Sequence, residues 1–137
     1  MTLFVDSSAF YAAAVENDRN NPRAVAIITS GELLVTTDHV LVETLLLLQR
    51  RLSHHLAERF WGRIRDGAAT VECVTPADLE LAWDIGLSFP DQRFSIVDRT
   101  SFAVMQRLGV FRAATFDDDF AVFRFGPRRD RAFEIVR

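Results

Sequence analysis

The chain contains no lysine, because all sixteen of its basic residues are arginine. Two carboxylate chemistries found on α/β folds, the receiver-type phosphoacceptor aspartate and the haloacid-dehalogenase-type phosphatase, use a lysine beside the aspartate. A phosphate-binding loop of the P-loop type also ends in a lysine. The absence of lysine therefore excludes all three kinds of site.

Cysteine and histidine are scarce. Cys73 is the only cysteine, so the chain can form neither an internal disulfide framework nor a thiolate zinc site. The three histidines, His39, His54 and His55, have no third ligand at a spacing suited to zinc. A chain without disulfides suits a reducing compartment, and we expect a cytoplasmic protein.

Long apolar segments are also missing. Met1 leads directly into a predicted strand, with neither a basic region nor a membrane-length apolar run, so we expect no signal peptide and no membrane span. The formal net charge of −3 argues against a general polyanion-binding protein. With 137 residues, 49% of them hydrophobic and 26% charged, the composition is typical of one globular domain. Residues 1–137 are predicted to form that domain.

Short apolar strands alternate with helical segments along the whole chain, which predicts an α/β fold: a mostly parallel sheet of four or five strands with helices on both faces, making three layers. The first helix is expected near Ala9, capped by Ser7 or Ser8. The helix over 39–51 is apolar almost all round in its first half, so it is expected to be buried. The predicted strands cover residues 3–5, 33–36, 70–74, 112–116 and 133–136.

Two aspartates follow predicted strands directly. Asp6 comes after the first strand, and Asp117 follows the fourth and is joined by Asp118 and Asp119. In open α/β sheets ligands bind outside the carboxyl ends of the strands, so both positions are candidates for a site. Structural alternatives remain open, since Asp6 could simply accept bonds from backbone amides and three consecutive acids could form a solvated turn.

Two further acids lie on predicted helices. Glu43 stands in the apolar run 40–48, where an unpaired carboxylate would be costly; either a buried arginine or a metal ion could compensate it. Asp98 follows Ser95 by three residues, which also fits a capping box. If Glu43 and Asp98 lie near the same edge of the sheet as Asp6 and Asp117, their charges need a cation. Oxygen ligands alone favour Mg²⁺ or Mn²⁺, and such ions support phosphodiester hydrolysis.

Four segments of the chain resemble the PIN domain, specifically the VapC-type toxin ribonucleases of bacterial toxin–antitoxin pairs. They are Phe4-Val5-Asp6-Ser7-Ser8, residues 38–44 with Glu43, residues 94–105 with Ser95 and Asp98, and Ala114-Thr115-Phe116-Asp117-Asp118-Asp119-Phe120. Each segment is short, but the four occur in the family's order from one end of the chain to the other.

The resemblance implies an acidic quartet made of Asp6, Glu43, Asp98 and Asp117. Of these, Asp6, Asp98 and Asp117 would hold Mg²⁺ or Mn²⁺. Supporting roles fall to Ser8, Ser95 and Asp119. The resemblance further implies endonuclease cleavage of structured RNA such as tRNA or rRNA, a homodimer, and inhibition by a cognate VapB-type antitoxin. Without lysine, RNA contact falls to arginine, and the candidates are Arg50, Arg51, Arg93, Arg99 and Arg124.

Two other readings stay open. A catalytically silent PIN-like module could bind RNA or protein without cutting, although an incomplete quartet would be more typical of it. A PIN nuclease in RNA maturation would carry the same residues as a toxin. The amphipathic helix around Leu56, Phe60 and Trp61 is a candidate surface for the dimer.

Overall fold

The computed structural model describes all residues, 1–137, and contains one five-stranded sheet in the order β3-β2-β1-β4-β5. Every neighbouring pair of strands is parallel. The strands are β1 (Thr2–Val5), β2 (Leu33–Thr37), β3 (Thr70–Glu72), β4 (Arg112–Ala114) and β5 (Glu134–Val136). The predicted parallel sheet is therefore confirmed, with β1 at its centre.

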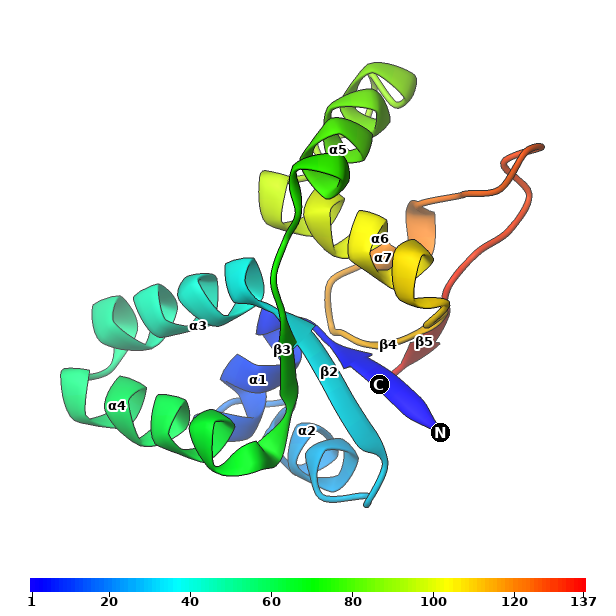
Figure 1. Cartoon of the computed structure of the whole chain (residues 1–137). Coiled ribbons are helices and arrows are strands. Elements are labelled where there is room, and N and C mark those ends of the chain that lie inside the picture. Colours follow the sequence, from blue (N-terminus) through cyan, green and yellow to red (C-terminus); the bar gives the residue numbers. More distant parts are fainter.

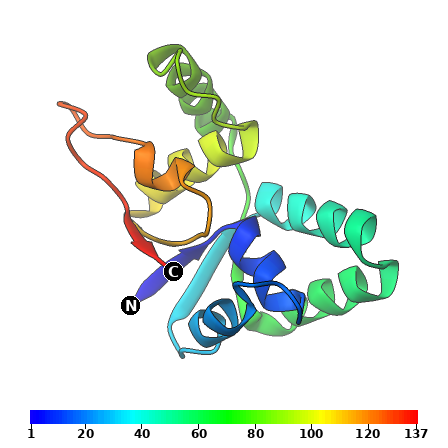
Figure 2. The ribbon, with the colours of Figure 1, turned by 180° about the vertical axis from the view of Figure 1, so that it is seen from behind.

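Helices cover both faces of this sheet (Figure 1, Figure 2). Figure 1 and Figure 2 show α1, α2 and α4 together on one side and α5, α6 and α7 on the other, while α3 contacts both α1 and α6. The helices are α1 (Ser7–Ala14), α2 (Asn21–Ile28), α3 (Asp38–Arg51), α4 (His54–Arg63), α5 (Pro76–Ser88), α6 (Ile96–Leu108) and α7 (Asp119–Val122), with a π-helical turn at Ile64–Ala68. The three-layer prediction is confirmed. None of these helices combines the length and the apolar character that crossing a membrane requires.

A cluster of phenylalanines forms the core between the sheet and α6. Phe102 is fully buried, and its ring stacks on Phe123 with 4.3 Å between centroids. Edge-to-face contacts join it to Phe120 at 4.9 Å and to Phe94 at 5.3 Å. Offset and edge-to-face geometries are the favourable ones for aromatic pairs, so this cluster fixes α6 against the sheet.

The first helix begins two residues earlier than predicted. Asp6, not Ser7 or Ser8, is the N-cap of α1, and its carboxylate accepts a hydrogen bond from the Ser8 backbone amide. Aspartate caps a helix as well as serine does. The carboxylate after β1 therefore has a local structural role in addition to any chemistry.

The expectation that α3 is buried was wrong for one of its faces. Val40, Thr44 and Leu48 point into the protein, but Val42 is 53% exposed and Leu46 is 47% exposed. Positions four residues apart share a helix face, so Val42 and Leu46 form an apolar stripe directed at solvent. Glu43 lies beside this stripe and is only half-buried.

Strand β4 ends at Ala114, two residues before the predicted end. Thr115 and Phe116 leave the sheet because their polar groups bond to α1 and to the following loop. The segment after them forms the short helix α7, where the sequence indicated only a turn. Strand β3 is likewise two residues shorter than predicted.

Candidate functional site

A cavity of about 470 Å³ opens at the carboxyl ends of the central strands. Six acidic side chains line it. Asp18 comes from the loop between α1 and α2, and the other five are Asp6, Glu43, Asp98, Asp117 and Asp119. Asp6 follows β1, Glu43 lies on α3, Asp98 lies in the first turn of α6, and the other two of these five follow β4. The four candidate quartet residues and Asp119 are thus brought together in one place.

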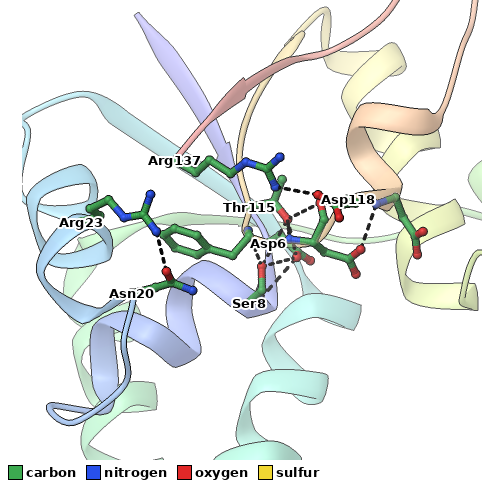
Figure 3. A network of polar contacts seen from close by, with 10 residues as sticks. Asp6, Ser8, Asn20, Arg23, Thr115, Asp118 and Arg137 are labelled. Carbon is green, nitrogen blue, oxygen red and sulfur yellow. Dashed lines mark hydrogen bonds and ion pairs between the residues drawn. The ribbon is translucent and has the colours of Figure 1, made fainter.

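Asp6 lies at the bottom of this cluster and is 2% exposed. Hydroxyls of Ser8 and Thr115 donate to its Oδ2 at 2.9 and 3.0 Å (Figure 3). Burial raises the pKa of Asp6, and the hydrogen bonds from Ser8, Ser7 and Thr115 oppose that rise without cancelling it. Asp6 is therefore a carboxylate held in a fixed orientation at a site that disfavours its charge.

Asp98 projects into the cavity from the N-terminal turn of α6. Ser95 caps this helix by accepting from the Asp98 backbone amide at 3.0 Å, but no reciprocal bond reaches the Asp98 carboxylate. Only one of the two hydrogen bonds of a capping box is therefore present. The Asp98 carboxylate does not bond to the Ser95 amide, so it can bind a ligand in the cavity. Burial, then the charges of Asp6 and Asp117, and contact with Asp119 raise the pKa of Asp98 to about 8.

Asp117 and Asp119 complete the cluster. Carboxylate oxygens of Asp98, Asp117 and Asp119 all lie within 4.8 Å of one another. The Asp119 backbone amide donates to Asp117 Oδ1 at 2.9 Å, which fixes the turn between them. Asp118 is 84% exposed and pairs with Arg137 at 3.0 Å instead (Figure 3). Alternate acids of this run therefore face the cavity, and the middle one faces away.

Glu43 is oriented by Ser7, whose hydroxyl donates to its Oε1. The arginine partner left open by the sequence does not exist, because no ion pair of the structure includes Glu43. Since Glu43 is half-buried and borders the cavity, water and a ligand can compensate its charge.

The cluster has the character of a divalent-cation site. Its donors are carboxylate and hydroxyl oxygens, which suit a hard cation such as Mg²⁺ or Mn²⁺. Burial, and after it the charges of Asp6 and Asp117, raise the pKa of Asp98 to about 8, so this carboxylate stands where a cation would favour its charged form. No arginine or histidine forms an ion pair with any of the five acids. The residues present therefore fit a bound divalent metal.

The candidate RNA contacts divide into two groups. Arg51 and Arg93 line the acidic cavity, and Arg50 borders a neighbouring hollow that shares Glu43 with it. Arg99 donates to the carbonyls of Phe94 and Ala82, and so joins α6 to α5. Arg124 donates to three carbonyls at the end of α7. Only the first group lies where an RNA strand entering the cavity would pass.

Thr115 is the residue that sequence reasoning missed. It is fully buried, its hydroxyl donates to Asp6 Oδ2, and the same oxygen accepts from the Asp117 backbone amide at 3.0 Å. A threonine hydroxyl often accepts a hydrogen bond from the backbone amide two residues later, which makes a local turn. The sequence Thr115-Phe116-Asp117 has the spacing that such a turn requires. Thr115 therefore links two acids that are 111 positions apart, at 6 and 117.

We expect Thr115→Val to lower the rate of any reaction at this site by about 10- to 100-fold, because small displacements of reacting groups cost that much. Valine keeps the branched shape but removes the hydroxyl that orients Asp6. Catalytic rates and melting temperatures of Thr115→Val, Thr115→Ser and Thr29→Val would be compared. Thr115→Ser should restore most of the rate, and Thr29→Val should leave it unchanged because the Thr29 hydroxyl bonds only to the backbone of its own helix. An unchanged rate in Thr115→Val would show that the hydroxyl does not position Asp6.

The sequence of the chain is similar to a known family profile and to a known endonuclease. The PIN domain profile matches residues 3–126. The 23S rRNA-specific endonuclease VapC20 of Mycobacterium tuberculosis, in the CDC 1551 / Oshkosh strain, is 37% identical over 125 residues, which cover 90% of this chain and 95% of that protein.

Solved structures agree with the sequence match. The crystal structure of Mycobacterium tuberculosis VapC20, a sarcin–ricin-loop-cleaving toxin, superimposes with a TM-score of 0.83 at 34% identity, covering 88% of this chain and 93% of that one. The VapBC2 structure from Rickettsia felis, bound to a DNA fragment from its promoter, gives a TM-score of 0.69 at 6% identity, over 98% and 97% of the two chains; at that identity it shows the fold alone. The chain belongs to the PIN-domain family.

Proposed function

We propose that this protein is the toxin of a VapBC-type toxin–antitoxin pair and that it hydrolyses phosphodiester bonds of 23S rRNA with the help of Mg²⁺ or Mn²⁺. The observation that carries the proposal is the convergence of Asp6, Glu43, Asp98, Asp117 and Asp119, from four parts of the chain, on one cavity. The 37% identity to a 23S rRNA-specific endonuclease supports the choice of substrate. Residues 1–137 would form a single PIN domain.

The proposed mechanism assigns a task to each part of the site. Asp6, Asp98 and Asp117 would hold the divalent ion, with Glu43 and Asp119 completing the acidic wall. The bound ion would supply water activation and neutralise the charge that develops on the phosphate. Ser8 and Thr115 keep the Asp6 carboxylate in one orientation through their hydroxyls. Ser7 does the same for Glu43, and Ser95 holds the first turn of α6, which carries Asp98.

Substrate binding would fall to arginines at the rim of the cavity. The site itself is acidic and the formal net charge of the chain is −3, so RNA affinity requires cations placed beside the acids. Arg51 and Arg93 line the cavity and form no ion pair. Both are therefore available to contact the phosphates that flank the cut.

The proposed partners are the rRNA substrate, a VapB-type antitoxin and a second copy of the chain. The 34% identity to VapC20, which is a toxin, supports an antitoxin partner. Solvent-exposed apolar side chains support protein contacts at two helices, α3 with Val42 and Leu46 and α5 with Trp83 and Leu87, of which Trp83 is 63% and Leu87 65% exposed. The surface around Leu56, Phe60 and Trp61 remains a second candidate for the dimer, and Leu56 and Phe60 border an apolar hollow between α1, α2 and α4.

The direct test is cleavage of ribosomes and isolated 23S rRNA by the purified chain freed of any partner. Reactions would contain Mg²⁺, Mn²⁺ or EDTA, and primer extension would map the ends. We expect a defined cut in the sarcin–ricin loop with either metal and none with EDTA. Undiminished cutting in EDTA would refute metal dependence, and a folded protein that cuts no rRNA with either metal would refute the proposed function.

A further inference from the structure

Phe116 stands beside the acids without being needed to hold a cation. It lies between Thr115 and Asp117, lines the acidic cavity and is only half-buried. Only 4 of the 16 residues that line this cavity are hydrophobic, and Phe116 and Tyr11 are the two that carry aromatic rings. Phe116 is the one that lies within the run of residues that also carries Asp117 and Asp119. A flat apolar surface next to a phosphodiester-cutting site suits one component of RNA in particular, the nucleobase.

Hydrogen bonds fix Phe116 relative to the acids. Its backbone amide donates to Ser8 Oγ at 2.9 Å, and that hydroxyl in turn donates to Asp6 Oδ2 at 2.9 Å. Thr115 joins the same network from the other side (Figure 3). One chain of bonds therefore fixes both the carboxylate at the bottom of the site and the backbone that carries the ring.

Arg23 lies against the Phe116 ring. Its guanidinium carbon is 5.4 Å from the ring centroid, and Nη2 donates to Asn20 Oδ1 at 2.6 Å (Figure 3). The guanidinium therefore covers one face of the ring, while Phe116 and Asn20 line the cavity and Arg23 does not. Arg23 is exposed and pairs with no carboxylate. Its charge is therefore free to meet a phosphate.

These contacts match the way proteins bind unpaired nucleotides. Bases that are splayed out of an RNA loop stack on aromatic rings and on guanidinium planes, while arginine charges hold the adjoining phosphates. Phe116 supplies the ring, Arg23 supplies the charge, and the acids supply the cutting site within the same cavity.

We propose that Phe116, backed by Arg23, is the stacking platform for an unpaired nucleobase next to the phosphate that is cut, and that Arg23 contacts a neighbouring phosphate. The inference rests on the proposed RNA cleavage and adds the residues that position the substrate. Phe116 is accordingly a substrate-positioning residue that contacts the base and takes no part in holding the cation.

The test pairs changes in the protein with changes in the RNA. Wild type and Phe116→Leu would each cut a set of loop RNAs that carry a single abasic nucleotide at one position within two nucleotides of the mapped cut. Loss of one base–aromatic stack lowers kcat/KM by roughly 5- to 150-fold. We expect one abasic position to lower kcat/KM of the wild type about as much as Phe116→Leu lowers it on intact RNA. When the variant cuts the RNA that is abasic at this position, kcat/KM should fall no further than with either change alone.

Controls separate stacking from a general loss of structure. Phe116→Tyr should keep wild-type rates, because tyrosine retains the ring. Arg23→Ala should reduce the salt dependence of RNA binding by about one phosphate contact. The matched control is Arg129→Ala, because the Arg129 guanidinium lies over the Phe89 ring, 5.6 Å from its centroid, outside the cavity. This substitution should change neither the cleavage rate nor the salt dependence of RNA binding. Melting temperatures would verify that each variant is folded.

Each result decides the inference. If the losses from Phe116→Leu and from the abasic nucleotide multiply at every position, the ring does not stack on a base and the inference is wrong although the enzyme cuts RNA. If Phe116→Leu does not fold, two other variants decide the inference. Phe116 is not a stacking platform if Arg23→Ala leaves the salt dependence of RNA binding unchanged and Phe116→Tyr loses cleavage activity. A wild type that cuts no RNA would refute the proposed function itself, and this inference with it.

Discussion

Replacing Asp98 by asparagine is expected to lower the rate of RNA cleavage by on the order of 10³-fold while making the metal-free protein more stable. The rate falls because a neutral amide replaces a carboxylate whose oxygen lies within 4.8 Å of carboxylate oxygens of Asp117 and Asp119, the group proposed to hold the ion. Stability rises because burial, and after it the charges of Asp6 and Asp117, disfavour the charged form of this carboxylate and raise its pKa to about 8. Sites that crowd charges for function often reduce stability in this way.

The effect on stability should depend on pH with a definite sign. Because the folded-state pKa of Asp98 lies above its ordinary value of 3.8, the folded state binds a proton that the unfolded state releases between these two pH values. Metal-free wild type should therefore lose stability as pH rises from about 4 to 8, and Asp98→Asn should lose less. Near pH 7.5 in EDTA we expect the variant to melt about 3 to 10 °C above wild type.

The measurements are melting curves at several pH values in EDTA, repeated with Mg²⁺ or Mn²⁺, together with cleavage rates. Metal should raise the melting temperature of wild type more than that of Asp98→Asn, because only wild type keeps the full set of ligands. Asp118→Asn is the matched control, since Asp118 is the neighbouring acid that faces solvent and pairs with Arg137. A variant Asp98→Asn that cuts RNA at the wild-type rate would remove Asp98 from the site.

The second large effect concerns stability. Phe102→Ala should lower the free energy of unfolding by about 3 to 5 kcal/mol, because it deletes a fully buried ring at the centre of the aromatic cluster. That ring stacks on Phe123 and meets Phe120 edge to face, and an alanine side chain is too short to reach either. Since Phe102 lies on α6, four residues after Asp98, the substitution should also loosen the helix that carries that carboxylate.

Urea unfolding followed by circular dichroism would measure this change. Phe102→Leu should cost less than Phe102→Ala, because leucine leaves a smaller cavity. Leu33→Ala serves as the control, because this side chain is 71% exposed and its removal should change the free energy of unfolding by less than about 0.5 kcal/mol. Equal effects from Phe102→Ala and Leu33→Ala would mean that the aromatic cluster does not hold the core together.

Much of the fold was predictable because its signals are local. Apolar runs marked all five strands, and the capping box between Thr75 and Asp78 at the start of α5 is a signal of the same local kind. The errors occurred where tertiary contacts compete with local preference. Asp6 caps α1 in place of Ser7 or Ser8, and β4 ends early because Thr115 and Phe116 bond across to Asp6 and Ser8.

The burial of α3 shows a different limit. Its composition is that of a core helix, yet Val42 and Leu46 face solvent while Val40 and Leu48 face the protein. Hydropathy alone cannot tell a helix covered by its own chain from one whose second apolar face awaits a partner. The exposure of this face of α3 also explains why Glu43 has no arginine partner. A half-buried carboxylate beside a cavity is solvated, so it needs no buried counter-ion.

The sequence alone determined which residue types the site could contain. Oxygen ligands without a histidine or cysteine ligand set favoured a hard cation, and the absence of lysine excluded the competing carboxylate chemistries. The alternation of strands with helices placed Asp6 and Asp117 at the carboxyl ends of parallel strands. These conclusions hold because residue chemistry and strand propensity are properties of short segments.

Only the tertiary structure decided how those residues meet. The pairing of β1 with β4 brings Asp6 beside Thr115 and Asp117 across more than a hundred positions. Packing on the aromatic core directs Asp98 inward, and the Arg137 contact directs Asp118 outward. The orientation of these carboxylates and the repulsion between their charges depend on distances between segments that are far apart in the chain. These segments come close together only when the sheet forms.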